Sequence, residues 1–322
     1  MLGADSGGSG LRITLAVARQ DALPQAVGTV TSREPVRTGP EGIDAAHMLA
    51  QLVPAARDLL AGSEAAEGAG LSAVCVGAAG MATLGGQLRA ELPPALAREF
   101  GARHIALAAD AVTAYAGALG ELPGAVVAGG TGLIAMGTDL RTWRRADGWG
   151  HLLGDCGGGA WIGQAGLEAA MRAYDGRDGG SPALRERAEA LFGAPLSGLP
   201  AQLYPRTDRP AVLASFAPEV ARCAGHDPVA REVLHAAARE IAVAAAAVCP
   251  AGERASIALT GGLFRIGEPL VAPLRGELET RVPQARLLDP AGDPLDGALL
   301  IAARLASGAL RLPSDPALLS QS

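Results

Sequence analysis

The sequence contains no lysine and no asparagine, so all 27 of its Lys and Arg residues are arginines. Without lysine the chain cannot form a Walker A phosphate loop, use the strand lysine of protein kinases or make a Schiff base with pyridoxal phosphate. A coding bias toward Ala, Gly, Arg and Pro accounts for the absence itself. The three mechanistic classes are excluded whatever the cause.

Paired cysteines and long apolar runs are also absent. The four cysteines form no Cys-x-x-Cys pair, which favours reduced thiols over a disulfide framework or a zinc site. The longest nearly unbroken apolar run, 241–249, is far shorter than the ~18 residues that span a bilayer. The N-terminus shows no basic, apolar leader of the export type. We therefore expect a cytoplasmic protein that does not partner a membrane.

Charge and length narrow the class of protein further. The 27 basic and 33 acidic residues give a net charge of −6, and no basic run interrupts the chain, which argues against nucleic acid as a partner. Apolar residues make up 49% and charged residues 19% of the chain, as in a globular protein. A length of 322 residues indicates two domains.

Five short apolar runs each end in a small-residue or acidic turn that is followed by further patterned sequence, which predicts an α/β fold. Ligands bind outside the carboxyl ends of strands in open α/β sheets, so we expect the five turns to converge on one crevice. The turns lie at residues 5–8, 77–80, 110, 129–132 and 260–262.

The first and fourth turns are each followed by a second alternating strand, at 11–17 and at 133–137. We interpret this as a duplicated unit, with two unrelated hairpins as the alternative. The boundary falls near 117–123, where glycine and proline end a helical pattern. The Gly-, Pro- and charge-rich stretch 175–210 is expected to be loops around one helix at 182–192, and longer helices follow at 228–249 and 295–307.

The two glycine turns of this duplication offer backbone N–H groups, a hydroxyl and no bulky side chain. A phosphate chain requires these features where no lysine is present. A lone glycine turn is more often only a tight hairpin. Two glycine turns at corresponding positions of a duplicated unit instead favour phosphate binding. Asp5 opens the first turn and could hold hydrated Mg²⁺.

Two carboxylates follow predicted strands or turns. Asp110 ends an apolar strand at the start of a helix, where the plain alternative is a helix N-cap. Asp155 ends the glycine-rich turn 148–155 before another helix. One carboxylate acting as a base and the other as a hydroxyl anchor would suit a polyol substrate that is deprotonated at one position.

The order of these motifs resembles the N-acetylglucosamine kinase and BadF/BadG/BcrA/BcrD-type ATPase branch of the actin-like ATPase superfamily. The resemblance runs from residue 2 to about 305, and its most specific part is the Gly-Trp-Gly-His-x-x-Gly-Asp block at 148–155. It implies two ribonuclease-H-like α/β domains closing over a cleft that holds ATP and Mg²⁺. The domains would be 1–117 with a C-terminal helix at about 295–310, and 118–294.

The resemblance also implies a reaction, in which an ATP-dependent kinase phosphorylates the 6-hydroxyl of an amino sugar. N-acetylglucosamine is the expected substrate. Asp110 would be the general base and Asp5 would organise Mg²⁺. The sugar would be held by Gly148, Trp149, Gly150 and Asp155. The nucleotide phosphates would lie on Gly7, Gly8, Ser9, Gly130, Thr131 and Gly132, with Gly261 and Gly262 flanking the adenosine.

Two departures from the family pattern keep alternatives open. Cys156 and Gly158 stand where the family has an acid and a hydroxyl, and the loop 31–37 lacks the family's asparagine. Arg33 or Arg37 of this loop would meet a sugar carboxylate or only solvent. The substrate could thus be N-acetylmuramic acid or glucosamine, and the protein could instead be an activator ATPase or a non-catalytic sugar sensor. A homodimer also stays open.

Overall fold

The chain has two main β-sheets, in which five strands follow the same order. The computed structural model describes residues 1–8, 10–19, 22–63, 70–252 and 255–322. The chain divides into two compact units. The first comprises Met1–Pro123, Thr138–Trp143 and Asp289–Ser322, and the second Gly124–Gly137 and Arg144–Leu288.

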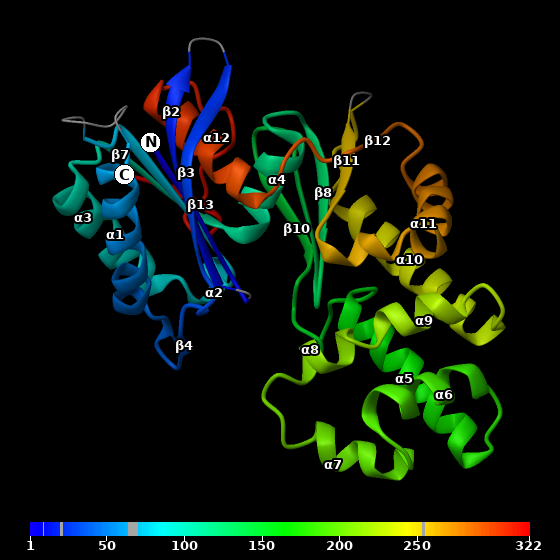
Figure 1. Cartoon of the computed structure of the whole chain (residues 1–322). Helices are drawn as coiled ribbons and strands as arrows, with labels where there is room; N and C mark the ends of the chain where they lie inside the picture. Colours follow the sequence, from blue (N-terminus) through cyan, green and yellow to red (C-terminus); the bar gives the residue numbers. More distant parts are fainter. Residues whose placement is uncertain (9, 20–21, 64–69, 253–254) are drawn as a thin grey trace. The chain divides into compact units, whose positions relative to one another are not determined.

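The sheet of the first unit has the order β13-β7-β6-β1-β2-β3 (Figure 1). β1, β2 and β3 form an antiparallel meander, whereas β6 and β7 run parallel to β1, and β13 is antiparallel to β7. Every residue of β6 is buried, as expected for a strand covered on both faces. The strands are β1 (Leu2–Gly7), β2 (Gly10–Arg19), β3 (Ala22–Ser32), β6 (Ala73–Ala78), β7 (His104–Ala109) and β13 (Leu319–Gln321).

Helices cover both faces of this sheet. The helices α1 (Ala45–Ala61) and α3 (Gly86–Phe100) lie on one face, and α4 (Asp110–Leu119) and α12 (Pro294–Ala306) lie on the other (Figure 1). α4 and α12 pack closely, because a Cβ on Gly117 would lie 1.9 Å from the carbonyl oxygen of Asp293. The short elements β4 (Thr38–Gly39), β5 (Gly42–Ile43) and α2 (Met81–Leu84) complete the unit.

The sheet of the second unit has the order β10-β9-β8-β11-β12, which matches β3-β2-β1-β6-β7 of the first. β11 is parallel to both β8 and β12. The predicted duplication is thus present as the same strand order in both units. The strands are β8 (Gly124–Gly129), β9 (Leu133–Thr138), β10 (Trp143–Asp147), β11 (Ser256–Thr260) and β12 (Arg286–Leu288).

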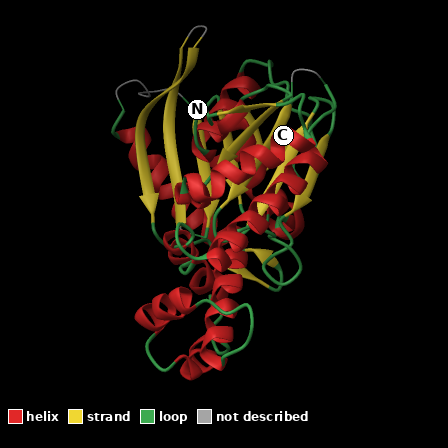
Figure 2. Ribbon diagram, turned by 90° about the vertical axis from the view of Figure 1, so that its right-hand side faces the viewer, coloured by secondary structure: helices red, strands yellow, loops and turns green. Residues whose placement is uncertain are grey.

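The second unit carries a helical region with no strands, shown as helices and loops in Figure 2. Its buried leucines, alanines and Phe216 belong to one hydrophobic core that also includes residues of β8, β9 and β11. The elements of this region are α5 (Gly159–Asp175), α6 (Pro182–Phe192), η2 (Leu196–Gly198), α7 (Leu199–Leu203), α8 (Arg209–Ala214), α9 (Ala217–Cys223) and α10 (Pro228–Val248). The second unit also has η3 (Gly262–Ile266) and α11 (Glu268–Arg281), which follow β11.

The expectation of loops around one helix in 175–210 was only partly right. The helix 182–192 is present as α6, but η2 and α7 follow it. Pro200 predicts a break in the chain, yet it lies in the first turn of α7, where a backbone N–H needs no partner within the helix. Among the helices that the structure describes, none is long and apolar enough to cross a membrane.

Candidate functional site

In the first unit, parallel pairing brings two of the predicted catalytic regions to one edge of the sheet. β1, β6 and β7 are adjacent and parallel, so their carboxyl ends lie together. Asp5 is near the end of β1, and Asp110 follows β7 directly. A Cβ on Gly7 or Gly8 would meet nothing within 4 Å, so this turn offers an accessible backbone. Ser9 lies outside the described residues.

Asp110 is the first residue of α4 rather than its N-cap. The N-cap is Ala109, which has extended backbone angles and no side chain that could accept a hydrogen bond. The alternative of a capping aspartate is therefore wrong at this position. Asp110 Oδ1 accepts a hydrogen bond from the N–H of Ala111 at 2.9 Å, and the first turn of a helix favours a carboxylate.

In the second unit, the glycine turn 129–132 lies against the start of α5. The N–H of Gly159 donates to Gly130 O at 2.9 Å, and the N–H of Ala160 donates to Thr131 O at 2.8 Å. A Cβ on Gly261 would lie 2.2 Å from Gly129 O, so the turn after β11 adjoins the turn after β8. The structure thus brings together the residues predicted to bind the nucleotide in this unit.

Asp155, the last residue of the turn 148–155, contacts both its own turn and the glycine turn 129–132. Its Oδ1 accepts a hydrogen bond from the N–H of Gly150 at 3.1 Å. Its Oδ2 lies 2.2 Å from the position that a Cβ on Gly132 would take. Burial raises the pKa of Asp155, and the charge of Asp147 adds to the rise, while the N–H groups of Gly150 and Leu133 oppose it.

Asp147 is a residue that the sequence analysis missed. Its Oδ1 accepts from the N–H of Asp155 at 2.5 Å, and its Oδ2 accepts from the N–H of Cys156 at 2.8 Å. It thereby fixes the backbone that carries Asp155, which has a left-handed φ of 56°. The available signal was an aspartate directly before Gly148, a common arrangement at turns.

Trp149 is 61% exposed and offers an aromatic face to solvent. The guanidinium carbon of Arg145 lies 4.3 Å from the centre of its ring, a cation–π contact. Arg145 also donates to Gly148 O at 2.5 Å. One arginine therefore orients two of the residues predicted to hold a sugar.

Arg33 lies on an exposed loop of the first unit that follows β3. His47 on α1 holds this loop: Nδ1 accepts from the N–H of Arg37 at 3.1 Å, and Nε2 lies 3.1 Å from Glu34 Oε1. Because Nδ1 accepts, the proton of the neutral ring is on Nε2, which donates to Glu34. The loop thus has a defined shape, with the Arg33 side chain exposed on it.

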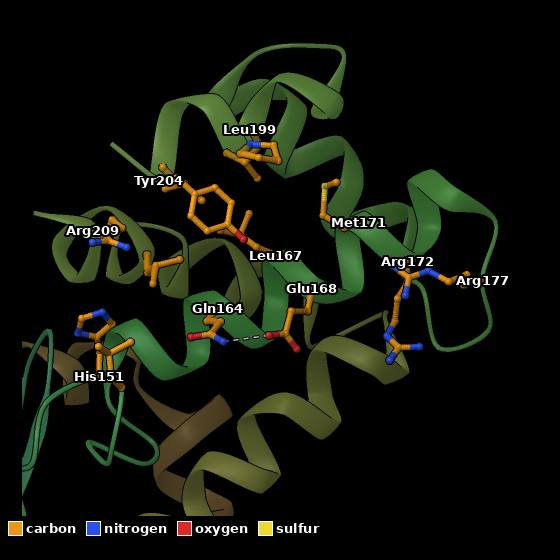
Figure 3. Close-up of a pocket in the computed structure, with 14 residues that line it drawn as sticks. His151, Gln164, Leu167, Glu168, Met171, Arg172, Arg177, Leu199, Tyr204 and Arg209 are labelled. Atoms are coloured by element: carbon orange, nitrogen blue, oxygen red, sulfur yellow. Dashed lines mark hydrogen bonds between the residues drawn. The ribbon is translucent and has the colours of Figure 1, made fainter. Parts of the chain in front are cut away.

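A cavity of about 480 Å³ lies in the helical region, beside the turn 148–155 (Figure 3). It shares only His151 and Leu152 with that turn, so it is distinct from the predicted sugar contacts. Gln164 donates to Glu168 at 3.0 Å along its α5 wall. The remaining lining residues are Leu167, Met171, Arg172, Arg177, Leu199, Pro200, Leu203, Tyr204, Arg209 and Leu213.

The described part of the chain contains no group of three or more His, Cys, Asp or Glu side chains that could hold a metal ion. A metal cage built by the protein alone is therefore not found there. Mg²⁺ in kinases and ATPases is bound by one or two carboxylates together with substrate phosphates and water. Asp5, beside an accessible glycine turn, fits that kind of site.

Two α/β units with the same strand order, each with a glycine turn after its first strand, define a two-domain actin-like ATPase fold of the sugar-kinase type. The model of the BadF/BadG/BcrA/BcrD ATPase family matches residues 2–302. The chain belongs to this family, which confirms the resemblance inferred from the motifs.

Solved structures share this fold. A candidate N-acetylglucosamine kinase from Chromobacterium violaceum has a similar structure, with a TM-score of 0.68, 28% identity, and coverage of 93% of this chain and 97% of that one. A ROK family glucokinase from Streptomyces griseus, solved with glucose and AMPPNP, shares the fold at a TM-score of 0.54 and 18% identity, covering 95% and 99% of the two chains.

The chain is also similar to the N-acetylmuramic acid/N-acetylglucosamine kinase of Clostridium acetobutylicum. The two are 28% identical over 200 residues, which is 60% of this chain. The match spans 65% of the length of that curated relative.

Proposed function

We propose that this protein is an ATP-dependent kinase that transfers the γ-phosphate of ATP to an amino sugar, with N-acetylglucosamine as the first substrate and its 6-hydroxyl as the acceptor. Membership of an ATPase family supports the use of ATP. The activity named for the Clostridium acetobutylicum relative supports an amino sugar. We also propose a cytoplasmic setting, since the reaction consumes the ATP of the cell.

One observation carries the proposal: Asp155 lies against the glycine turn at Gly132 and also bonds the turn 148–155 through Gly150. A carboxylate that can hold hydroxyl groups is therefore adjacent to a backbone that can hold phosphates. This adjacency favours phosphate transfer to a polyol over hydrolysis alone.

In this proposal the residues of each unit have separate tasks. Asp110 accepts the proton of the attacking hydroxyl, and the first turn of α4, where it lies, favours a carboxylate. Asp155 and the backbone of the turn 148–150 orient the sugar, with Trp149 packing against its ring. The glycine turns hold the phosphates through backbone N–H groups. Asp5 would hold the Mg²⁺ that accompanies ATP, and the metal would supply positive charge to neutralise the transferring phosphate.

The loop that carries Arg33 concerns the choice of sugar. Its exposed guanidinium could bond a carboxylate, which N-acetylmuramic acid has and N-acetylglucosamine lacks. We propose that Arg33 makes the enzyme accept an acidic amino sugar in addition to the neutral one. An Arg33→Gln variant should lose turnover of the acidic sugar and keep that of the neutral one.

A coupled assay of ADP release from Mg-ATP tests the proposed function. The panel is N-acetylglucosamine, glucosamine, N-acetylmuramic acid, N-acetylmannosamine and glucose, each compared with a reaction without sugar. The proposal expects one amino sugar to stimulate ADP release well above the sugar-free rate. Equal ADP release with and without every sugar would favour an activator ATPase, and no release at all would favour a sugar sensor.

A further inference from the structure

Arg12 of β2 lies directly opposite Asp5 of β1 in the hairpin register. Its Nη2 bonds Asp5 Oδ2 at 2.8 Å, and its Nη1 bonds Asp293 Oδ2 at 2.5 Å. One guanidinium thus joins two carboxylates that are far apart in the sequence. The Asp5 side chain is only 16% exposed and that of Arg12 34% exposed, so solvent screens this contact less than a surface ion pair.

Asp293 is itself held firmly. It is the N-cap of α12, and its Oδ1 accepts from the N–H groups of Leu295 at 2.8 Å and Asp296 at 3.1 Å. Asp296 closes the capping box by accepting from the N–H of Asp293 at 2.9 Å. Both oxygens of Asp293 are therefore engaged, and Arg12 is anchored to the start of a helix rather than to a mobile side chain.

The charge states of the pair agree with this geometry. Burial acts to raise the pKa of Asp293, but the bonds from Arg12 and from backbone N–H groups outweigh it, and the net pKa is lowered. Arg12 thus favours the ionised form of Asp293.

The arginine-only composition of the chain suits this bridge. The planar fork of a guanidinium can bond two carboxylates through two different nitrogens at fixed angles, which a single ammonium group does less well. Because Arg12 takes Oδ2, the orientation of the Asp5 carboxylate is set. Among the described residues, Oδ1 of Asp5 has no hydrogen-bond donor, so this oxygen is available to a metal-bound water.

We propose that Arg12 is a positioning residue for phosphate transfer: it orients the Asp5 carboxylate toward the metal that accompanies the nucleotide, and Asp293 orients Arg12. The inference rests on the proposed function, in which Asp5 holds Mg²⁺. Arg12 also strengthens binding of the nucleotide directly, since its positive charge attracts the net negative Mg-nucleotide complex. Loss of Arg12 therefore weakens binding of that complex and disorders the carboxylate.

The test is the affinity for ADP, measured by calorimetry with and without Mg²⁺ in the wild-type protein and in Arg12→Met. We expect Mg²⁺ to tighten ADP binding in the wild type, and this tightening to shrink about tenfold in the variant, the worth of one charge-assisted hydrogen bond. Arg12→Lys retains the charge without the fork and should recover part of the effect. Arg239→Met removes an exposed Arg239–Glu232 pair on α10 and serves as the control.

Asp293→Asn separates positioning from folding. Asparagine is as good an N-cap as aspartate, so α12 keeps its cap while the ionic bond to Arg12 is lost. We expect a small change of Tm and an effect on Mg²⁺-dependent ADP binding between those of the wild type and Arg12→Met. If Arg12→Met does not fold, Asp293→Asn and Arg12→Lys test the positioning role of Arg12 in its place.

A folded Arg12→Met protein with the wild-type response to Mg²⁺ would overturn the positioning role. A wild-type protein that binds Mg-ADP yet phosphorylates none of the sugars would overturn the proposed function instead. Since the role of Arg12 is measured by ADP binding alone, the two failures are distinguishable.

Discussion

Oδ2 of Asp155 occupies the space beside Gly132, 2.2 Å from where a Cβ would lie. This proximity means that the glycine turn and the carboxylate form one structure: the residue at 132 must lack a side chain for Asp155 to remain in place. The two positions are 23 residues apart (155 − 132) and belong to different motifs of the sequence. Their contact is what joins the proposed phosphate and sugar regions of the second unit.

Gly132→Ala should therefore displace Asp155 and damage both regions. We expect the free energy of unfolding to fall by about 1–3 kcal/mol, the usual effect of crowding a packed site. Denaturant unfolding measures this change. Gly130→Ala is the matched control for stability, because a Cβ there meets nothing within 4 Å. Equal stability of the two variants would contradict the contact.

Asp155→Asn should make the protein more stable at neutral pH while it weakens sugar binding. Burial raises the pKa of Asp155, so the folded state binds its proton more tightly than the unfolded state does. The charged form therefore lowers stability, and the loss develops as the pH rises from about 3.9 through the raised pKa. The uncharged amide can still accept from Gly150.

The measurement for Asp155→Asn is Tm as a function of pH. We expect the variant to melt above the wild type at about pH 7, and the difference to vanish below about pH 3.9, where both side chains are neutral. A variant that melts lower than the wild type at neutral pH would show that Asp155 is stabilising when charged.

Much of the fold could be predicted because its signals are local. The strands that end at Gly7, Ala78, Ala109, Gly129 and Thr260 were expected from apolar runs followed by glycine or aspartate. The helices at 182–192, 228–249 and 295–307 were expected to within one residue at each end, from caps and helical patterning. Periodicity and turn chemistry are properties of neighbouring residues, and a single sequence displays them.

The supporting residues could not be predicted in the same way. Arg12 acts through a residue on the opposite strand and through Asp293 at the far end of the chain, so its partners follow from strand register and from the packing of α12. Asp147 acts through N–H groups eight and nine residues away. Such contacts depend on the tertiary fold, and neither charge nor spacing in the sequence distinguishes these residues from others of their type.

Gly117→Ala should destabilise the first unit. α4 and α12 approach so closely that the added Cβ would lie 1.9 Å from the backbone oxygen of Asp293, which cannot rotate away. We expect the free energy of unfolding to fall by about 1–3 kcal/mol. Gly276→Ala, in α11 and with nothing within 4 Å, should instead stabilise by about 0.5–1 kcal/mol through helix propensity. Thermal melts of both variants decide whether close packing or propensity governs position 117.

Asp110→Asn tests the proposed chemistry most directly. Asparagine has the same shape as aspartate and can still accept from the N–H of Ala111, so the start of α4 should stay intact. It cannot take a proton from the attacking hydroxyl. We therefore expect kcat for sugar phosphorylation to fall by about 10²–10⁴-fold, the usual contribution of a general base.

The same Asp110→Asn protein should keep the wild-type Tm and the wild-type Kd for ATP, because neither the helix start nor the glycine turns are altered. The pH profile adds a second criterion. If Asp110 is the base, the rise of kcat/KM with pH that reports its ionisation in the wild type should be absent from the variant's residual activity. A variant with wild-type turnover, or with an unchanged profile and reduced turnover, would assign the base to another group.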